Sequence, residues 1–174
     1  MGQSTDAILA YGYVWGDEAS LFNEDEGDEW VEALAVRRGI PNPWTLYRDS
    51  GAQADHNALP YVQQEPAYES WKVSVGFDAL LEDWDSARKA IKAEHPDISV
   101  GFHCSCDFPM PYICIASTKQ QAGRGYPVTF DPRTMALEQD NINWLGYLAM
   151  FTDALGIDLT EAQGPDWFLV SNWC

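Results

Sequence analysis

Residues 7 to 14 read A-I-L-A-Y-G-Y-V, an uncharged run rich in aliphatic and aromatic side chains. A run of this length and composition predicts a buried β-strand. Further strands are predicted where apolar residues alternate with small or polar ones, most clearly in I-S-V-G-F-H-C-S-C, residues 98 to 106. The full set of predicted strands is 7–14, 71–77, 98–106, 112–117, 126–130 and 167–171.

Three other segments repeat their apolar residues at the spacing of an α-helix. In the first segment, Trp30, Val31 and Leu34 form one stripe. Asp28 is placed to cap the start of this helix, and Gly39 is placed to end it. The three predicted helices cover residues 28–38, 78–94 and 139–155.

The order of these elements predicts an α+β fold, with a mixed or mostly antiparallel sheet and about three helices packed on it. A chain of 174 residues buries enough surface for one core without disulfides or metals, so we expect a single domain over residues 1–174. Residues 40–69 are rich in proline, glycine, asparagine and glutamine and lack clear periodicity. They predict a long irregular excursion from this domain.

Charge is distributed unevenly along the chain, whose formal net charge is −17. Residues 1–36 hold nine acids and no base, and residues 134–174 hold six acids and no base. All ten bases lie in residues 37–133, together with twelve acids. The two ends of the chain therefore carry −15 of the net charge.

The densest acidic cluster lies in L-F-N-E-D-E-G-D-E-W, residues 21 to 30. Carboxylates at spacings similar to those of phosphates are attracted to the Lys- and Arg-lined surfaces that bind nucleic acids. We therefore expect a partner-binding face, for which Trp15 or Trp30 is a candidate apolar anchor, while a position in the core is the better explanation of Trp30. Its expected residues are Asp17, Glu18, Glu24, Asp25, Glu26, Asp28, Glu29 and Glu32.

The same composition disfavours several other classes of function. With a pI near 4.2, charge repulsion opposes direct binding to nucleic acid. The apolar runs are shorter than the ~20 residues that span a bilayer, and no secretory leader is recognisable, so we expect a cytoplasmic protein without membrane contact. The acidic cluster also lacks the glycine and glutamate spacing of an EF-hand calcium loop.

The tightest group of potential metal ligands is H-C-S-C-D, residues 103 to 107, followed by Cys114. If Cys114 lies close by on the returning strand, three thiolates could hold zinc together with a fourth ligand. Cysteines in an otherwise apolar strand are more typical of core packing. We predict no catalytic residue, no metal and no cofactor.

The opening G-Q-S-T-D-A-I-L-A-Y-G-Y, residues 2 to 13, leads into an acidic stretch and resembles the start of small acidic proteins encoded by tailed bacteriophages. The resemblance implies action in the cytoplasm of the infected host. Together with the charge, it suggests an inhibitor of the DNA-mimic or anti-CRISPR type, which binds a basic surface of a host nucleic-acid-binding complex.

Three alternatives stay open from the sequence. The acids could serve only to keep the protein in solution. The chain could be a small enzyme that uses carboxylates with Cys104, Cys106 or His103. It could also be a phage assembly component with no inhibitory role.

Overall fold

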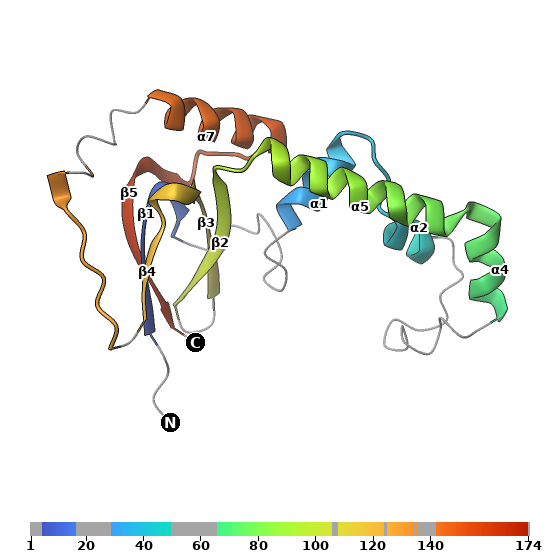
Figure 1. Cartoon of the computed structure of the whole chain (residues 1–174), viewed down its shortest axis with the longest axis horizontal. Helices are drawn as coiled ribbons and strands as arrows, with labels where there is room; N and C mark the ends of the chain where they lie inside the picture. The colour runs from blue at the N-terminus through green and yellow to red at the C-terminus, as the bar shows by residue number, and fades with distance from the viewer. Residues whose placement is uncertain are drawn as a thin grey trace. The chain divides into compact units, whose positions relative to one another are not determined.

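The computed structural model describes residues 5–16, 29–49, 66–105, 108–123, 125–133, 135 and 142–173. The chain forms two compact units (Figure 1). We call Met1–Trp30 with His95–Cys174 the sheet unit, and Val31–Glu94 the helical unit. The single domain expected over residues 1–174 stays a prediction.

The sheet unit is built on a five-stranded, curled sheet whose strand pairs are all antiparallel. β1 (Thr5–Trp15) is its central strand and pairs with β5 (Ala162–Trp173) along one edge. Its other edge pairs with β3 (Phe108–Ile115) and then with β4 (Gln120–Ala122), and β2 (Ile98–Ser105) pairs with β3. The predicted α+β class and four of the predicted strands are confirmed.

β1 is central because it is apolar on both faces. Ile8 and Ala10 are buried on one face, where they pack with Tyr112 and Cys114. Alternate residues of a strand point to opposite faces, and β1 buries Tyr11, Tyr13 and Trp15 on the second face. α7 (Ile142–Leu155) lies across this unit and buries Leu148, Phe151 and Leu155, as its periodicity predicts (Figure 1).

A short 3-10 helix, η2 (Ala116–Thr118), separates β3 from β4 along the same edge of β1. Its last residue, Thr118, is buried. The Thr118 hydroxyl accepts a hydrogen bond from the backbone N–H of Tyr11 at 3.0 Å and donates one to the carbonyl of Ile115 at 2.7 Å. This side chain therefore replaces a backbone partner that β1 loses where the neighbouring strand is interrupted.

The helical unit holds α2 (Pro43–Asp49), α4 (Pro66–Val75), α5 (Phe77–Glu94) and most of α1 (Glu29–Arg37). α1 and α5 confirm two predicted helices, although Asp28, the expected cap of α1, lies outside the described residues. With α7, the described part of the chain contains five α-helices, where about three were expected.

The strand predicted at residues 71–77 is wrong, because these residues end α4 and begin α5. Gly76, at φ 65°, joins the two helices. Alternation over so short a run does not distinguish a strand from a helix, and Val73 is 80% exposed, so the alternating side chains share no buried face. Trp71 and Phe77 instead pack on each other, with ring centroids 5.4 Å apart.

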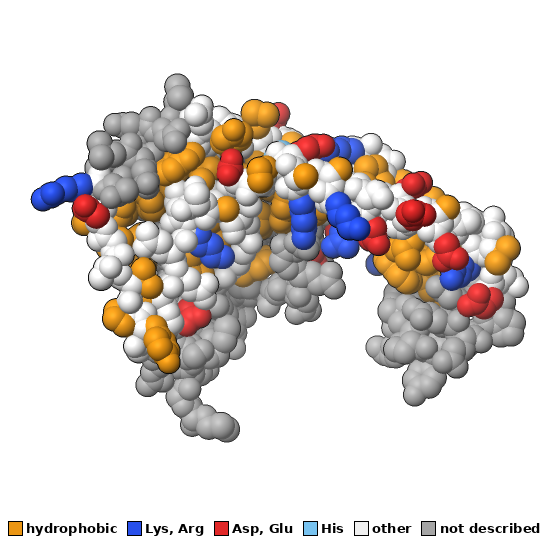
Figure 2. All heavy atoms as spheres, in the orientation of Figure 1, with side chains coloured by type: hydrophobic (Ala, Val, Ile, Leu, Met, Phe, Trp, Pro, Cys, Tyr) orange, Lys and Arg blue, Asp and Glu red, His pale blue; other side chains and the backbone are white. Residues whose placement is uncertain are grey.

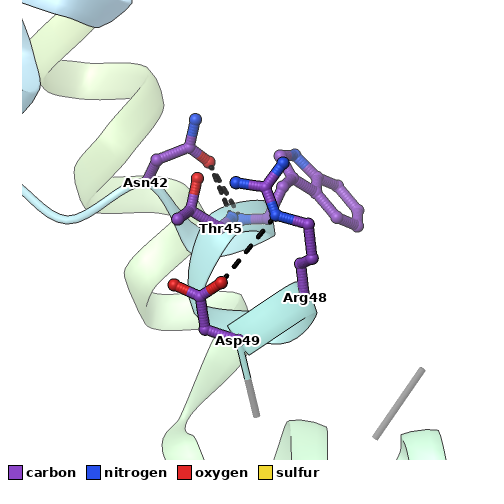
Figure 3. A network of polar contacts seen from close by, with 5 residues as sticks. Asn42, Thr45, Arg48 and Asp49 are labelled. Atoms are coloured by element: carbon purple, nitrogen blue, oxygen red, sulfur yellow. Dashed lines mark hydrogen bonds and ion pairs between the residues drawn. The ribbon is translucent and has the colours of Figure 1, made fainter. Parts of the chain in front are cut away.

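Of the irregular excursion predicted at residues 40–69, residues 40–42 have no regular structure, residues 43–49 and 66–69 are helical instead, and residues 50–65 lie outside the described part. α2 begins with an N-terminal capping residue, Asn42. This capping signal is hard to recognise in the sequence because residues 40–69 are rich in proline, glycine and asparagine. The Asn42 side-chain oxygen accepts hydrogen bonds from the backbone N–H groups of Trp44, at 2.9 Å, and Thr45, at 3.4 Å (Figure 3). Pro43 follows this cap at the first helical position, where a missing N–H costs nothing.

The strand predicted at residues 126–130 is also wrong, because this segment has no regular secondary structure. β4, a few residues earlier, pairs with β1 at Ala7, Ile8 and Leu9. Residues 126–130 therefore have the alternation of a strand without a position in the sheet. Tyr126, Val128 and Phe130 are all exposed.

Candidate partner-binding site

Two of the eight predicted partner-binding residues lie in the described part of the chain. Glu29 begins α1. One carboxylate oxygen of Glu32 lies 3.5 Å from Nη2 of Arg88, and the other accepts a hydrogen bond of 3.4 Å from the Asn42 side chain. Glu32 thus links three segments of the helical unit. The six that lie outside the described residues are Asp17, Glu18, Glu24, Asp25, Glu26 and Asp28.

Both indoles are buried in the core, which confirms the core position expected of Trp30 and contradicts the anchor role considered for Trp15 or Trp30. The Trp30 ring packs edge-on against Phe151, with centroids 5.1 Å apart, and lies 6.2 Å from the ring of His95. A buried ring cannot enter a partner's pocket unless the core opens. These two residues therefore stabilise the sheet unit.

Charge divides between the two units in a way that linear sequence does not show. The sheet unit contains seventeen acids and three bases, a formal charge of −14. The helical unit contains ten acids and seven bases, a formal charge of −3. Most of the excess negative charge therefore falls in the segments that make up the sheet unit, where eight of the seventeen acids lie in the described residues.

Most bases of the helical unit lie close to acids of the same unit. Figure 2 shows basic and acidic side chains interspersed along α5. Ion pairs join Arg38 to Glu94 at 2.7 Å and Lys72 to Asp78 at 2.9 Å. In the sheet unit, Lys119 lies over the ring of Tyr112, 5.3 Å from its centroid. Most basic side chains of the helical unit therefore pair with acidic side chains of the same unit.

Strands from the two base-free ends of the chain are direct neighbours in the sheet. β1 and β5 pair from Thr5 opposite Trp173 to Trp15 opposite Ala162 (Figure 1). The acidic segment 17–28 leaves β1 at the Trp15 end, where Asp158 and Glu161 precede β5 and are exposed. Hydrogen bonds from Thr160 lower the pKa of Asp158, which favours its charged form. Glu161 directly precedes Ala162, the partner of Trp15, so one described acid lies close to this end of β1.

The described residues do not assemble the three-thiolate zinc site considered from the sequence. Cys114 lies opposite Ser99, whereas Cys104 lies opposite Pro109. Five positions along β2 separate these points, which is ~16 Å of strand. Cys106 lies outside the described residues. Within the described ranges, no three His, Cys, Asp or Glu residues form a group that could hold a metal.

His103, the histidine of the same sequence cluster, is buried on β2. Burial lowers its pKa, and a hydrogen bond with the backbone of Trp15 opposes this effect. The ring is therefore held neutral and tied to the end of β1. Among the described residues, no contact between His103 and a cysteine thiol is observed. The structure therefore does not support the Cys–His pair of the enzyme alternative.

Cys114 is expected to make the protein less stable at alkaline pH. Burial raises the pKa of its thiol to about 11, despite the opposing effects of Lys119 and a hydrogen bond with Ser99. Between pH 9 and 11 the unfolded state loses this proton while the folded state keeps it, so the free energy of unfolding falls by up to ~2.7 kcal/mol. Denaturant unfolding of wild-type and Cys114→Ala protein across this range measures the difference. Equal slopes in the two proteins would contradict the prediction.

An apolar pocket on the second face of the sheet was not predicted. Its floor is formed by Ala7 and Leu9 of β1, Ala122 of β4 and Leu169 of β5. Val128 and Phe130 form a wall, and Gln120 contributes the polar edge. The alternation of Tyr126, Val128 and Phe130 is the sequence signal for the apolar residues of this wall, but the same alternation is typical of a strand. We call these seven lining residues the apolar pocket; its volume is about 130 Å³.

Within the described ranges, no helix is both long enough and apolar enough to cross a membrane. Neither the described geometry nor the charge pattern points to a catalytic centre. The features that remain are the charge of the sheet unit and the apolar pocket on its sheet. Comparison of the chain with protein-family models, with curated proteins and with solved structures gave no match.

Proposed function

We propose that this protein binds a basic surface of a nucleic-acid-binding complex through its sheet unit and blocks access of nucleic acid to that surface. The observation that carries the proposal is the concentration of −14 of the net charge in the sheet unit. As a phage protein of the DNA-mimic or anti-CRISPR type, it would act on a complex of the host cytoplasm.

Concentrated charge supports binding in a way that evenly spread charge does not. At physiological ionic strength the screening length is about 8 Å, so only charges close to the interface attract a partner strongly. The sequence assigns seventeen acids and three bases to the sheet unit, so a partner that docks on this unit is expected to meet carboxylates more often than bases. Cationic grooves that bind DNA provide the complementary field and gain association rate from it.

The adjacency of β1 and β5 further supports a localised site. These strands come from the two base-free ends of the chain and hold their neighbouring acids in one unit. A protein that needed charge only to stay in solution would gain nothing from this segregation. The helical unit, at −3, would then contribute structure or a second contact rather than the main attraction.

Capture from a bacterial lysate is expected to recover a DNA- or RNA-binding complex, and recovery is expected to fall steeply with salt. Raising the salt from about 0.1 M to 1 M shortens the screening length from about 10 Å to 3 Å, so most of the complex should be lost. Mass spectrometry identifies the captured protein. A competition assay between labelled duplex and this protein on the purified complex then measures the block.

Two results would remove support from this proposal. Capture that persists unchanged in 1 M salt would show that charge does not drive binding. Simultaneous binding of DNA and this protein to the purified complex would show that the nucleic-acid surface is not the one covered.

A further inference from the structure

The apolar pocket is left open because two elements cover different parts of the same sheet face. Tyr11, Tyr13 and Trp15 are buried near one end of β1, and the ring of Tyr11 packs on Trp144 of α7, with centroids 5.4 Å apart. Ala7 and Leu9, toward the other end, are covered only partly by residues 126–130. The result is exposed apolar surface in a unit that otherwise carries strong charge.

The exposure is large for the residues concerned. Leu169 is 72% exposed, although it lies in the sheet opposite Leu9. Tyr126 is 79% exposed, and Val128 and Phe130 are each about half exposed. Val128, Phe130 and Leu169 all line the apolar pocket, so their exposed apolar surface is continuous across it. This surface is on the order of a few hundred Å², which is the size of apolar patch that is often functional on a monomer.

The volume of the pocket limits what can enter it. A cavity of about 130 Å³ is close to the ~150 Å³ of an engineered apolar cavity that stays dry and binds benzene. One aromatic ring or one branched aliphatic side chain would therefore fill the space. The pocket is too small for most cofactors, which occupy several hundred Å³.

The charge of the sheet unit indicates which kind of partner would supply the side chain that fills the pocket. The described charged residues within three positions of the lining in sequence are Asp6, Lys119, Asp131, Arg133 and Asp166, three acids and two bases with a sum of −1. The surroundings of the pocket thus carry little charge of their own, within a unit of charge −14. A second copy of the chain would bring two such units together and would be repelled, whereas a cationic segment would be attracted.

We propose that the apolar pocket is an anchor site, which receives one aromatic or branched aliphatic side chain from a Lys- and Arg-rich segment of the partner. The inference rests on the proposed function for the charge of that partner. In this arrangement the field of the sheet unit speeds encounter, and the anchor slows dissociation.

A peptide titration tests the anchor site without knowledge of the partner. The probes are K-K-G-W-G-K-K, the same peptide with alanine in place of tryptophan, and E-E-G-W-G-E-E, each followed by NMR on the full chain. The tryptophan peptide is expected to bind about tenfold more tightly than the alanine peptide, because one buried ring contributes at least 1.4 kcal/mol. The acidic peptide is expected not to bind.

A matched pair of variants locates the effect. Leu169→Gln removes part of the apolar floor of the pocket without changing charge, and it is expected to reduce the preference for tryptophan to about twofold. Met150→Gln makes the same type of change on α7, at a side chain that is 67% exposed and outside the pocket, and it should leave the preference intact. Both positions are exposed, so both variants should fold.

The outcomes separate the anchor site from the proposed function. Equal, salt-sensitive binding of the tryptophan and alanine peptides would overturn the anchor site and leave the proposed function standing. Equal binding of the basic and acidic tryptophan peptides would show that a cationic partner is not required. It would therefore count against both the anchor site and the proposed function. Absence of binding by any peptide would overturn the anchor site. A dimer seen by light scattering, and dissociated by Leu169→Gln, would overturn it in favour of a second copy.

Discussion

Gly12→Ala is expected to destabilise the sheet unit by at least ~3 kcal/mol and to make most of the protein insoluble on expression. Gly12 lies on β1 where the backbone of β3 comes unusually close. A Cβ atom added there would overlap the carbonyl oxygen of Ile113 and lie 2.7 Å from Cα of Cys114. Backbone atoms of a central strand pair cannot move aside as a flexible side chain can, so the β1–β3 pairing itself would have to shift.

The β5 side of Gly12 offers no relief. The register of β1 and β5 shifts between Gly12 and Val14, which marks an irregularity in the ladder. On β5, Gly164 has φ 116°, and a Cβ there would overlap the carbonyl oxygen of Gly12. The backbone is therefore crowded from both neighbouring strands, and a side chain at Gly12 has no direction in which to relax.

Denaturant unfolding of the purified variant measures the loss, with Gly146→Ala as control. Gly146 lies in α7, and a Cβ added there meets nothing within 4 Å. Since alanine is preferred to glycine in a helix by about 0.5–1 kcal/mol, this variant should be slightly more stable than wild type. A Gly12→Ala protein as stable as Gly146→Ala would contradict the close strand contact.

Reversal of Glu24, Asp25 and Glu26 to lysine is expected to weaken binding to the captured complex by about 100-fold, mainly by slowing association. The three residues belong to the segment that joins β1 to α1, in the more highly charged unit. Removing three carboxylates and adding three ammonium groups changes attraction to repulsion at the proposed contact. Surface plasmon resonance at two salt concentrations measures the association rate and its salt dependence.

A matched control separates a local site from total charge. Glu82, Asp83 and Asp85 are exposed on α5 in the helical unit, and their reversal to lysine changes the net charge by the same amount. This control is expected to weaken binding less than tenfold. Equal losses in the two triple variants would show that only the net charge matters, and the proposed site would then be wrong. Thermal unfolding of both variants checks that the fold is retained.

Patterns that depend on one segment alone were predictable. The apolar run at residues 7–14 forms the central strand because side chains on both of its faces are apolar and must be removed from water. The periodicity of residues 78–94 gives α5, in which Trp84 and Ile91 are buried and the helix ends before His95 and Pro96. Burial and helix capping act over a few residues, so the sequence contains the whole signal.

Patterns that several segments share were not predictable. The alternation at residues 71–77 fits a strand as well as the end of one helix and the start of another. The packing of Trp71 on Tyr47, 4.9 Å between ring centroids, adds a contact between segments that local sequence does not encode. Likewise, residues 126–130 have strand-like alternation, but β4 occupies the edge of β1.

By itself, the sequence determined the net charge and the absence of basic residues from both chain ends. It also determined the α+β class, the central strand and the helices with clear periodicity. These properties follow from composition and from periodicity within single segments. Only the tertiary structure decided that strands from the two ends pair, that most of the negative charge belongs to one unit, and that an apolar pocket remains open beside it. Each of these features depends on which distant segments pack together. Their packing is driven by burial of apolar surface, which depends on the whole chain and not on any one segment.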